Sequence, residues 1–220
     1  MDLHDARRDY SGGLLPDAID NPWAFFEEWF MEALAEQQAG RVAEATAMVL
    51  STVDADGRPS SRIVLAKAFG PGLGTHGGVD FYTSADSRKG QALQANGVAS
   101  LLFFWPSLNR QVHLEGAVNP KPVEAAETYF HQRPHGSQVA AAVSKQSCPR
   151  LSRASLEAEF EDAMARYGVG EVPRPEDWLG WRVEPDRIEF WQGLPSRLHD
   201  RISCTLNPVT GTWRSERLDP

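Results

Sequence analysis

The chain has few cysteines and no long apolar run. Its 220 residues include two cysteines, Cys148 and Cys204, which form neither a metal-ligand pattern nor a disulfide framework. We therefore expect two free thiols, which fits a reducing compartment such as the cytoplasm. No apolar stretch approaches membrane-spanning length, and residues 1–16 lack the apolar segment of a secretory signal. The sequence predicts a soluble cytoplasmic protein with no membrane partner.

Positive charge is also scarce. The 22 Lys and Arg residues are outnumbered by 30 Asp and Glu residues, so the net charge is −8. This balance argues against nucleic acid as a partner. Any bound anion must therefore be held by local clusters of cations. Hydrophobic residues make up 41% of the chain, enough for one domain with a full core.

The hydrophobic pattern predicts a mainly β domain at residues 21–220, flanked by helices and preceded by an extended, partly mobile arm at residues 1–20. Asn21 and Pro22 are a typical helix start, and a stripe of aromatic residues continues to a stop at Gly40. Further helices are expected at 87–96, 122–133 and 152–167. Strands are expected at 47–53, 60–67, 79–83, 98–105, 110–119, 180–184, 187–191, 197–205 and 212–218. Short strands between turn signals indicate an antiparallel barrel or sandwich rather than a parallel sheet.

The run from Arg197 to Arg201 is the most informative segment. In an extended strand, Arg197, His199 and Arg201 would project from the same face. The aromatic run at residues 189–193 indicates a half-buried strand, where unpaired charge is costly. An anion or an electron-rich ring against the three side chains would offset that cost. A solvated basic edge strand is the alternative, and we favour an anionic ligand.

A second cluster lies where a strand leads into a helix. Tyr82 and Thr83 end the strand, and Ser87, Arg88 and Lys89 begin the helix. Free backbone N–H groups, the positive end of the helix dipole, a hydroxyl and two cations suit a phosphate. An ordinary helix cap with solvated charges is the alternative.

A third cluster includes Tyr129 and Arg133, which are four residues apart and so share a helix face, with Ser137 after the helix break. These groups suit a second phosphate, although a surface Tyr/Arg stack is about equally consistent with the spacing. Arg62 and Lys67 stand at the two ends of one strand. Their odd separation places them on opposite faces unless a bulge intervenes.

Two other motifs are interpreted as structural. Residues 70–74 are rich in glycine but lack the strand-to-helix context of a phosphate loop, and we expect a long hairpin loop. His131 and His135 have zinc-like spacing, but Pro134 separates them and no third ligand is evident, so no metal site is expected. His113 is interpreted as a structural strand residue.

Taken in order, the motifs resemble the pyridoxine/pyridoxamine 5′-phosphate oxidase family over nearly the whole chain. The motifs that carry the resemblance are Arg62–Lys67, Phe81–Thr83, Ser87–Lys89, Arg110–Val112, Ser144–Ser147 and Glu189–Arg201. The resemblance implies a split antiparallel β-barrel that forms a homodimer, with FMN bound between the subunits. One departure is Val139–Ala142, where the family usually reads Ile-Gly-Ala-Trp.

The resemblance also implies residue roles. Those implied for FMN are Arg62, Ile63, Val64, Leu65, Lys67, Tyr82, Thr83, Ser87, Arg88, Lys89, Gln111, Gln146, Ser147, Trp191 and Arg201. Those implied for the substrate are Lys67, Tyr129, Arg133, Ser137, Arg197, His199, Arg7 and Tyr10. The resemblance implies that the arm at residues 1–20, which contains Arg7 and Tyr10, closes over the site as a lid. Arg197 and His199 would lie over the substrate ring and carry the catalytic role. Neighbouring positive charge should bias His199 towards its neutral form, in which it could accept a proton.

The implied reaction is the FMN-dependent oxidation of pyridoxamine 5′-phosphate and pyridoxine 5′-phosphate to pyridoxal 5′-phosphate. Dioxygen would be the acceptor and hydrogen peroxide the second product. Two alternatives remain: a related split-barrel flavin oxidase of phenazine type, and a non-catalytic protein that binds FMN or pyridoxal phosphate. The predicted substrate-phosphate cradle argues against a phenazine, whose carboxylate needs no such cradle. Retention of Arg197 and His199 argues against a carrier.

Overall fold

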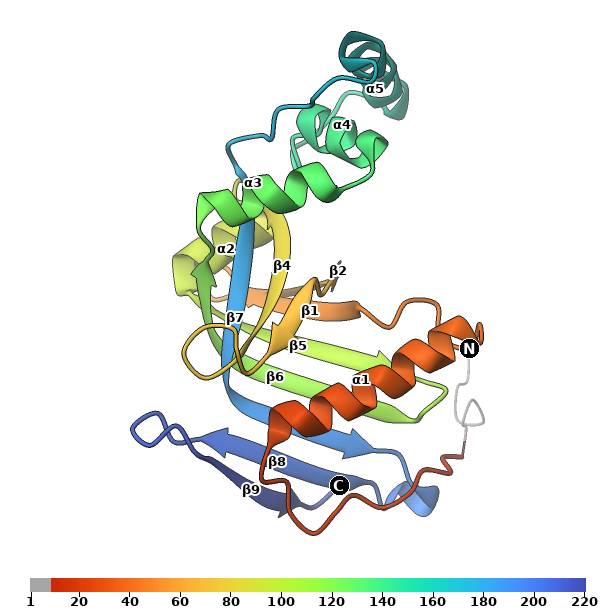
Figure 1. Ribbon diagram of the computed structural model, residues 1–220, viewed down its shortest axis with the longest axis vertical. Helices are drawn as coiled ribbons and strands as arrows, with labels where there is room; N and C mark the ends of the chain where they lie inside the picture. The colour runs from red at the N-terminus through yellow and green to blue at the C-terminus, as the bar shows by residue number, and fades with distance from the viewer. Residues whose placement is uncertain (1–8) are drawn as a thin grey trace.

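The computed structural model describes residues 9–220, which form a curled antiparallel sheet of nine strands flanked by five α-helices (Figure 1). The strands are β1 (Ala47–Val53), β2 (Pro59–Leu65), β3 (Ala68–Gly70), β4 (Gly78–Ser84), β5 (Val98–Trp105), β6 (Arg110–Pro120), β7 (Trp178–Gln192), β8 (Asp200–Leu206) and β9 (Trp213–Leu218). The helices are α1 (Pro22–Gln38), α2 (Arg88–Asn96), α3 (Val123–Gln132), α4 (His135–Val143) and α5 (Arg153–Tyr167), with a 3₁₀ turn, η1, at Pro195–Arg197. This architecture confirms the predicted fold class.

The strand order along the sheet is β2-β1-β5-β6-β7-β4-β3, with β8 and β9 added beside β7. The first half of β7 pairs with β4 and its second half pairs with β8. The sequence predicted two separate strands here, and this prediction is wrong: Pro185 lies inside one continuous strand. It is accommodated opposite Gly116 of β6, where the register shifts and no side chain would fit.

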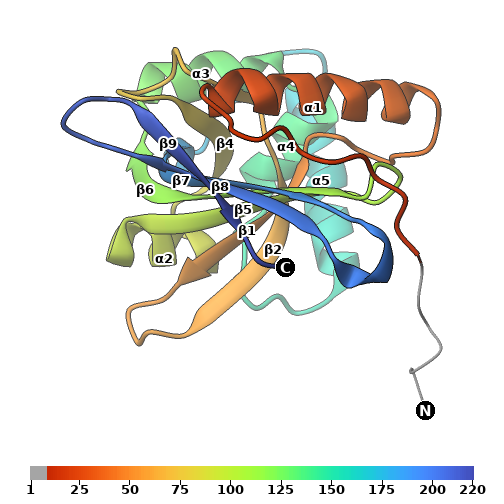
Figure 2. The same ribbon diagram turned by 90° about the horizontal axis from the view of Figure 1, so that it is seen from below.

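Helix α1 begins as predicted. The Asn21 side chain accepts a hydrogen bond from the backbone N–H of Ala24 (3.1 Å), and Pro22 occupies the first turn. The buried aromatic face of α1 packs on the sheet, with the fully buried Phe26 5.2 Å from Phe103 between ring centroids. Figure 2 shows α1 lying along one side of the sheet. The aromatic stripe is therefore part of the core, as predicted.

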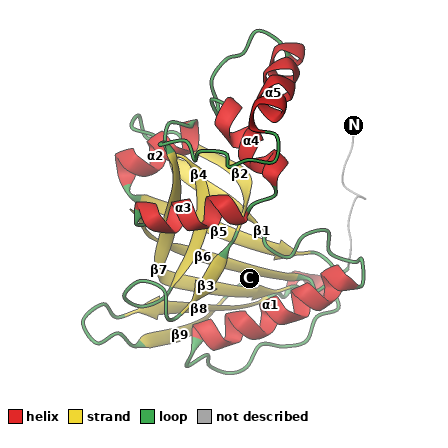
Figure 3. Ribbon diagram, turned by 45° about the horizontal axis from the view of Figure 1, so that its top comes forward, coloured by secondary structure: helices red, strands yellow, loops and turns green. Residues whose placement is uncertain are grey.

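A second hydrophobic cluster joins the other helices to the sheet. Its buried members include Phe130 of α3, Val139 of α4, Ala163 of α5 and Trp178 at the start of β7. Helices α3, α4 and α5 gather at the end of the molecule away from β8 and β9 (Figure 3). Helix α4 and the three-residue β3 were not predicted. Strand β3 is too short to show a hydrophobic period, and α4 directly follows Pro134, which was interpreted only as the end of the preceding helix.

The strand predicted at residues 197–205 begins later than expected. Pro195 opens the turn η1, and Ser196 and Arg197 adopt left-handed backbone conformations, with φ of 57° and 64°. A strand cannot pass through two such residues, so β8 starts only at Asp200. Arg197 and His199 therefore do not alternate with Arg201 along one strand, and the geometric argument for a shared strand face is wrong.

The segment before α1 lies across the ends of the last two strands. The Leu15 N–H donates to the Asp200 carboxylate (2.9 Å), and Arg217 donates to the Pro16 carbonyl (2.8 Å). Further along, the Ile19 N–H donates to the Ser215 hydroxyl (3.1 Å). These contacts anchor residues 15–19 to the sheet.

No helix within residues 9–220 is long and apolar enough to cross a membrane. The same residues contain no cluster of three or more His, Cys, Asp or Glu side chains that could hold a metal ion. Both cysteines are free thiols: Cys148 is exposed and Cys204 is buried.

Candidate cofactor and substrate site

The first cluster forms around the start of α2, where the sequence predicted a phosphate site. The Ser87 hydroxyl caps the helix by accepting from the Gly90 N–H (3.2 Å). Lys89 donates to the side-chain oxygen of Gln146 (2.8 Å), and the Thr83 hydroxyl donates to the same oxygen (2.8 Å). The loop after α4 therefore brings Gln146 to the end of β4, as the predicted site requires.

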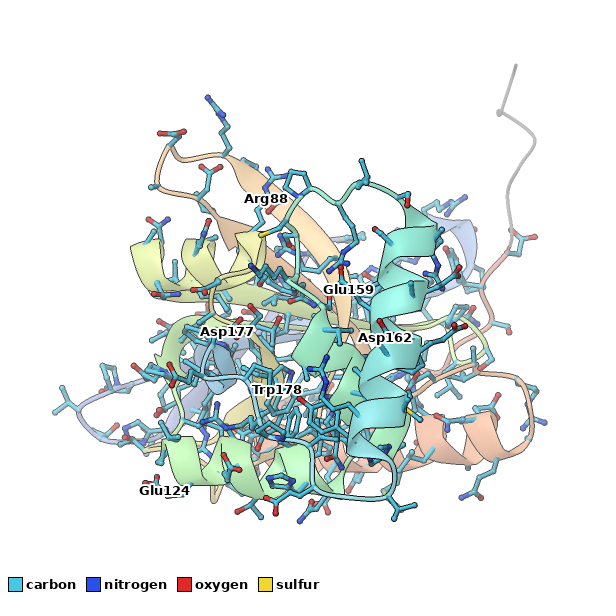
Figure 4. All side chains as sticks on the ribbon, turned by 90° about the horizontal axis from the view of Figure 1, so that it is seen from above. Arg88, Glu124, Glu159, Asp162, Asp177 and Trp178 are labelled. Atoms are coloured by element: carbon cyan, nitrogen blue, oxygen red, sulfur yellow. The ribbon has the colours of Figure 1, made fainter. Side chains whose placement is uncertain are left out.

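Arg62 joins this cluster from β2. Its guanidinium donates to the Leu50 carbonyl (2.9 Å), the Thr52 hydroxyl (2.9 Å) and the Ser60 hydroxyl (2.5 Å), all of which are neutral. Arg88 is close enough to affect the pKa of Arg62. Figure 4 labels Arg88 at the start of α2. Three cations from two separate elements thus gather at one place.

The electrostatics of this cluster suit an anion. Burial, reinforced by the positive charge of Arg62, lowers the pKa of Lys89 to about 8. Burial and the charge of Arg88 likewise lower the pKa of Arg62. No carboxylate within residues 9–220 contributes to either shift. A phosphate would supply the missing negative charge through charge-assisted hydrogen bonds.

The second cluster is an aromatic stack between the sheet and α3. The rings of Tyr82 and Tyr129 lie 4.2 Å apart at 23°, and Trp178 stacks on Tyr82 at 5.3 Å. The Arg133 guanidinium lies 4.9 Å from the centre of the Trp178 ring. Its Nη1 atom is buried without a hydrogen-bond partner among residues 9–220, so Arg133 has an unused donor for a ligand.

A cavity of about 460 Å³ adjoins both clusters. Its lining includes Arg133 and Trp178 from the aromatic stack and Gln146 from the cationic cluster. Figure 4 shows Asp177 and Trp178 between α2, α3 and α5. Tyr82 and Thr83 point to opposite sides of β4, so Tyr82 joins the predicted substrate residue Tyr129 while Thr83 joins the predicted phosphate site of the cofactor.

Several predicted residues lie nearby without a recorded side-chain contact to either cluster within residues 9–220. Lys67 is exposed just beyond β2, where its N–H donates to the Asp80 carbonyl (2.8 Å). Ser137 is in the first turn of α4, and the exposed Ser147 has a left-handed backbone with φ of 69°. Three further predicted cofactor residues, Ile63, Val64 and Leu65, follow Arg62 at the end of β2.

The third cluster lies on the sheet itself. Gln111 of β6 pairs with Trp191 of β7, which pairs with Arg201 of β8. Directly opposed residues project from the same face, so the three side chains form a row. They line a concavity of about 320 Å³ together with Leu102, His113 and Glu189. The structure thus brings together three residues that the sequence predicted for the cofactor.

The predicted catalytic pair adjoins this row. His199 packs on Trp191 with ring centroids 4.7 Å apart. Tyr10 lies edge-on to His199 (5.3 Å), and the Arg197 guanidinium lies 5.6 Å from the Tyr10 ring. Arg197 and His199 are therefore together as expected, but a turn places them there rather than a strand. Arg7, the other predicted residue of the arm, lies outside the described residues.

The hydrogen bonding of His199 indicates which ring nitrogen carries the hydrogen. Its Nδ1 atom accepts a hydrogen bond from the Leu194 N–H (3.2 Å), which requires Nδ1 to be unprotonated. Burial, then the charge of Arg197, lowers the pKa of His199. The neutral form is therefore favoured, as predicted, with its hydrogen on Nε2. In this tautomer His199 offers a donor at Nε2, so the expectation that it accepts a proton does not fit this hydrogen bond.

Arg62 of the first cluster and the Gln111–Trp191–Arg201 row of the third cluster lie on opposite faces of the sheet. Arg62 lies opposite Leu50, which lies opposite Leu101, which lies opposite Leu114. These residues therefore share one face, and three of them are core residues. Gln111 is three positions from Leu114 along β6 and projects from the other face. The row of Gln111, Trp191 and Arg201 thus faces away from Arg62.

Sequence reasoning missed three residues around these clusters. Trp178 stacks on Tyr82 and lies against the Arg133 guanidinium. The only signal for it in the sequence is a Trp at the start of a strand. Lys121 donates to the Tyr82 hydroxyl (3.1 Å) from outside any motif. His113 was interpreted as structural, yet it lines the concavity with Gln111; its even spacing from Gln111 was the available signal.

The family models match almost the whole chain. Residues 34–167 match the model described as pyridoxamine 5′-phosphate oxidase. Residues 178–220 match the pyridoxine 5′-phosphate oxidase C-terminal dimerisation region. The chain belongs to the pyridoxine/pyridoxamine 5′-phosphate oxidase family, which is a family of oxidoreductases.

Individual relatives agree with this assignment. The pyridoxine/pyridoxamine 5′-phosphate oxidase of Bordetella petrii is 48% identical, with all of both chains covered. That of Chromobacterium violaceum is 46% identical over all of this chain and 99% of its own. Among solved structures, PhzG from Burkholderia lata in complex with tetrahydrophenazine-1-carboxylic acid has a TM-score of 0.82 at 29% identity, covering 94% of this chain and 98% of its own.

A more distant structure shows the fold alone. It is a pyridoxamine 5′-phosphate oxidase-related, FMN-binding protein from Nostoc punctiforme, with a TM-score of 0.70 at 18% identity. The match covers 91% of this chain and 98% of that one. The split-barrel architecture predicted from the sequence is thus found in these relatives.

Proposed function

We propose that this chain is an FMN-dependent oxidase that converts pyridoxamine 5′-phosphate and pyridoxine 5′-phosphate to pyridoxal 5′-phosphate. The observation that carries the proposal is that cationic donors are available to an anion at two separate places. Among residues 9–220, no carboxylate contributes to the pKa shifts of Arg62 and Lys89, and Arg133 has a buried donor without a partner. A flavin mononucleotide and a phosphorylated vitamer together bring two phosphates. Membership of the family supports the same pairing.

The residues fit FMN on the chemistry of the donor set. Arg62, Arg88 and Lys89 would hold the phosphate, with Thr83 and Gln146 fixing the lysine. Gln111, Trp191 and Arg201 would hold the ring system. When bound, FMN supplies the redox chemistry, taking two electrons from the substrate and delivering them to dioxygen, which becomes hydrogen peroxide. With the amine substrate, water is consumed and ammonia released, which completes the balance.

The protein's own contribution is orientation. Arg133 and Tyr129 would bind the substrate phosphate, with Lys67 and Ser137 completing the cradle. Arg197 and His199 would lie against the substrate ring, where the Nε2–H of His199 can donate to an oxygen substituent. Holding the substrate in a reactive orientation can contribute several kcal/mol to catalysis. Tyr10, packed against both residues, would cover the site from the arm.

The proposed assembly is a homodimer with one FMN in each of two interfacial sites. The two sets of cofactor residues face opposite sides of one sheet. In the strand order, Arg62 on β2 is three strands from Gln111, four from Trp191 and five from Arg201, which is about 14 to 24 Å along the sheet at the usual strand spacing. Within one chain the two sets face away from each other, so in the proposed dimer a partner supplies the second set. The match of residues 178–220 to a dimerisation region supports this arrangement.

The test is an aerobic assay of FMN-loaded protein with pyridoxamine 5′-phosphate, following pyridoxal 5′-phosphate and hydrogen peroxide together. We expect equal amounts of the two products, and little of either from unphosphorylated pyridoxamine. A flavin-bound protein that is silent with both phosphorylated vitamers would overturn the proposal. That result would favour a flavin oxidase of phenazine type, which is the second candidate function because of the similarity to PhzG.

A further inference from the structure

His113 occupies an unassigned position in the concavity beside β6. It projects from the same face as Gln111, two residues away, and both line the space of about 320 Å³ with Trp191 and Arg201. Its side chain is 32% exposed, so it is open to a ligand. In the proposed function, the other three residues, Gln111, Trp191 and Arg201, hold the flavin ring system.

One ring nitrogen of His113 is already engaged. Nε2 lies 2.6 Å from the Ser100 hydroxyl on β5 and 3.6 Å from the Glu115 carboxylate on its own strand. A nearby carboxylate favours the hydrogen on Nε2, since only a donor can face it. Nδ1 is then an acceptor, and within residues 9–220 it has no recorded hydrogen bond. The imidazole therefore has one nitrogen anchored to the sheet and one free.

The charges around the concavity are paired with one another. Arg187 of β7 donates to Glu115 (3.0 Å) and to Glu189 (2.7 Å), and Arg201 of β8 donates to Glu189 (2.9 Å). His113 is therefore not required to neutralise any of them. The His113 imidazole lines a concavity large enough for a ligand, and its Nδ1 makes no hydrogen bond within residues 9–220. It is therefore suited to contact a ligand.

We propose that His113 is a further flavin-contacting residue, whose Nδ1 accepts a hydrogen bond from the imide N–H of an isoalloxazine ring held against Gln111, Trp191 and Arg201. The inference rests on the proposed function. Because the contact is made to the ring and not to the phosphate, His113 acts equally on FMN and on riboflavin. Arg62, by contrast, acts only on the phosphorylated ligand.

Two substitutions separate this contact from the anchor on Ser100. The side-chain amide of His113→Gln reaches the position of Nε2, so it keeps the anchor and loses the ligand contact. That of His113→Asn reaches the position of Nδ1, so it keeps an acceptor towards the ligand and loses the anchor. His131→Gln on α3, whose side chain is 30% exposed and lies outside the concavity, is the matched control for loss of a histidine.

The experiment is titration of flavin-free protein with FMN and with riboflavin, followed by flavin fluorescence. Loss of one hydrogen bond predicts an affinity about three- to tenfold weaker for His113→Gln. The factor is the same for both flavins, and His113→Asn and His131→Gln bind within about twofold of the unchanged protein. Thermal unfolding of each variant confirms that it is folded.

Different failures point to different errors. If His113→Gln binds like the unchanged protein while His113→Asn is weakened, His113 is only a sheet anchor and the inference is overturned. If His113→Gln weakens FMN but not riboflavin, the residue serves the phosphate and the ring contact is wrong. If the unchanged protein binds no flavin, the proposed function fails and the inference fails with it.

Discussion

Positive charge gathers between β2 and the start of α2, and no carboxylate within residues 9–220 contributes to the pKa shifts of Arg62 and Lys89 there. Arg62 and Lys89 are partly buried and lie near each other, and their hydrogen-bond partners are neutral oxygens. Burial disfavours the charge of both, the charge of Arg62 further disfavours that of Lys89, and the charge of Arg88 that of Arg62, so holding this cluster together lowers stability. A bound phosphate would relieve the repulsion. The cost is therefore a signature of ligand binding rather than of stability.

This cluster predicts how flavin affinity depends on pH. Lys89 has a pKa of about 8 in the flavin-free protein, so it is cationic below that pH and loses its charge above it. We expect the dissociation constant for FMN to rise as pH increases through about 8. The measurement is a fluorescence titration at several pH values between 6.5 and 9.5. Lys89→Met should bind FMN more weakly at low pH and lose this dependence, whereas a Lys89→Met profile parallel to that of the unchanged protein would contradict the assignment.

The protonation of His199 can be tested directly. Its pKa is lowered first by burial and then by Arg197, so it should titrate below the ordinary value of about 6.5. Arg197→Met removes the second cause and should move the pKa upward, towards that value. The measurement is an NMR titration of the histidine ring protons. A pKa above 6.5 in the unchanged protein would contradict the effect of burial, and a downward shift in Arg197→Met would contradict the effect of the Arg197 charge.

At the scale of elements, local signals in the sequence predicted most helices and strands. The cap at Asn21, the turn at residues 54–57 and the stop before Pro134 all act within a few residues, so they can be read without the fold. The turn at Pro195 could not be placed in this way. Two residues without special backbone freedom, Ser196 and Arg197, adopt left-handed conformations that tertiary contacts must maintain.

The link between β4, β6 and α3 rests on a buried ionic group. Asp80 is 1% exposed and accepts from Lys121 (2.5 Å) and from Arg182 (2.7 Å). Lys121, just after β6, also donates to the Tyr82 hydroxyl (3.1 Å). Tyr82 in turn stacks on Tyr129 of α3. Lys121 is thus a positioning residue for the predicted substrate cradle.

Lys121→Met therefore tests whether this link positions the substrate. The loss of hydrogen bonds to a charged group should lower the free energy of unfolding by about 1.5–3 kcal/mol. It should also raise KM for pyridoxamine 5′-phosphate several-fold while kcat changes less, because the change loosens the Tyr82–Tyr129 stack and leaves Arg62, Arg88 and Lys89 untouched. Denaturant unfolding and steady-state kinetics measure the two effects, and Lys121→Arg should restore both. Destabilisation with an unchanged KM would assign Lys121 to the fold alone.

At the scale of the whole molecule, the sequence predicted which residues belong to the site but could not predict which face of the sheet each of them occupies. The division depends on the register of six strands, because a shift of one residue would turn Gln111 to the face of Leu114. Register follows from packing across the whole sheet and from the irregularity at Glu115 and Gly116. Motifs in order along the chain carry the resemblance to the family, but they contain no information about which copy supplies each side chain.

This division makes a quantitative prediction for mixed dimers. In the proposed dimer each site takes Arg62 from one chain and Arg201 from the other, so Arg62→Met and Arg201→Met should each be nearly inactive alone. When the two variants are co-expressed, a mixed dimer has one site with both substitutions and one site with neither. If half the dimers are mixed, total activity should return to about a quarter of that of the unchanged protein. Tagged chains purified in tandem measure the mixed dimer directly. A pure mixed dimer that stays inactive would mean that both arginines of a site come from one chain.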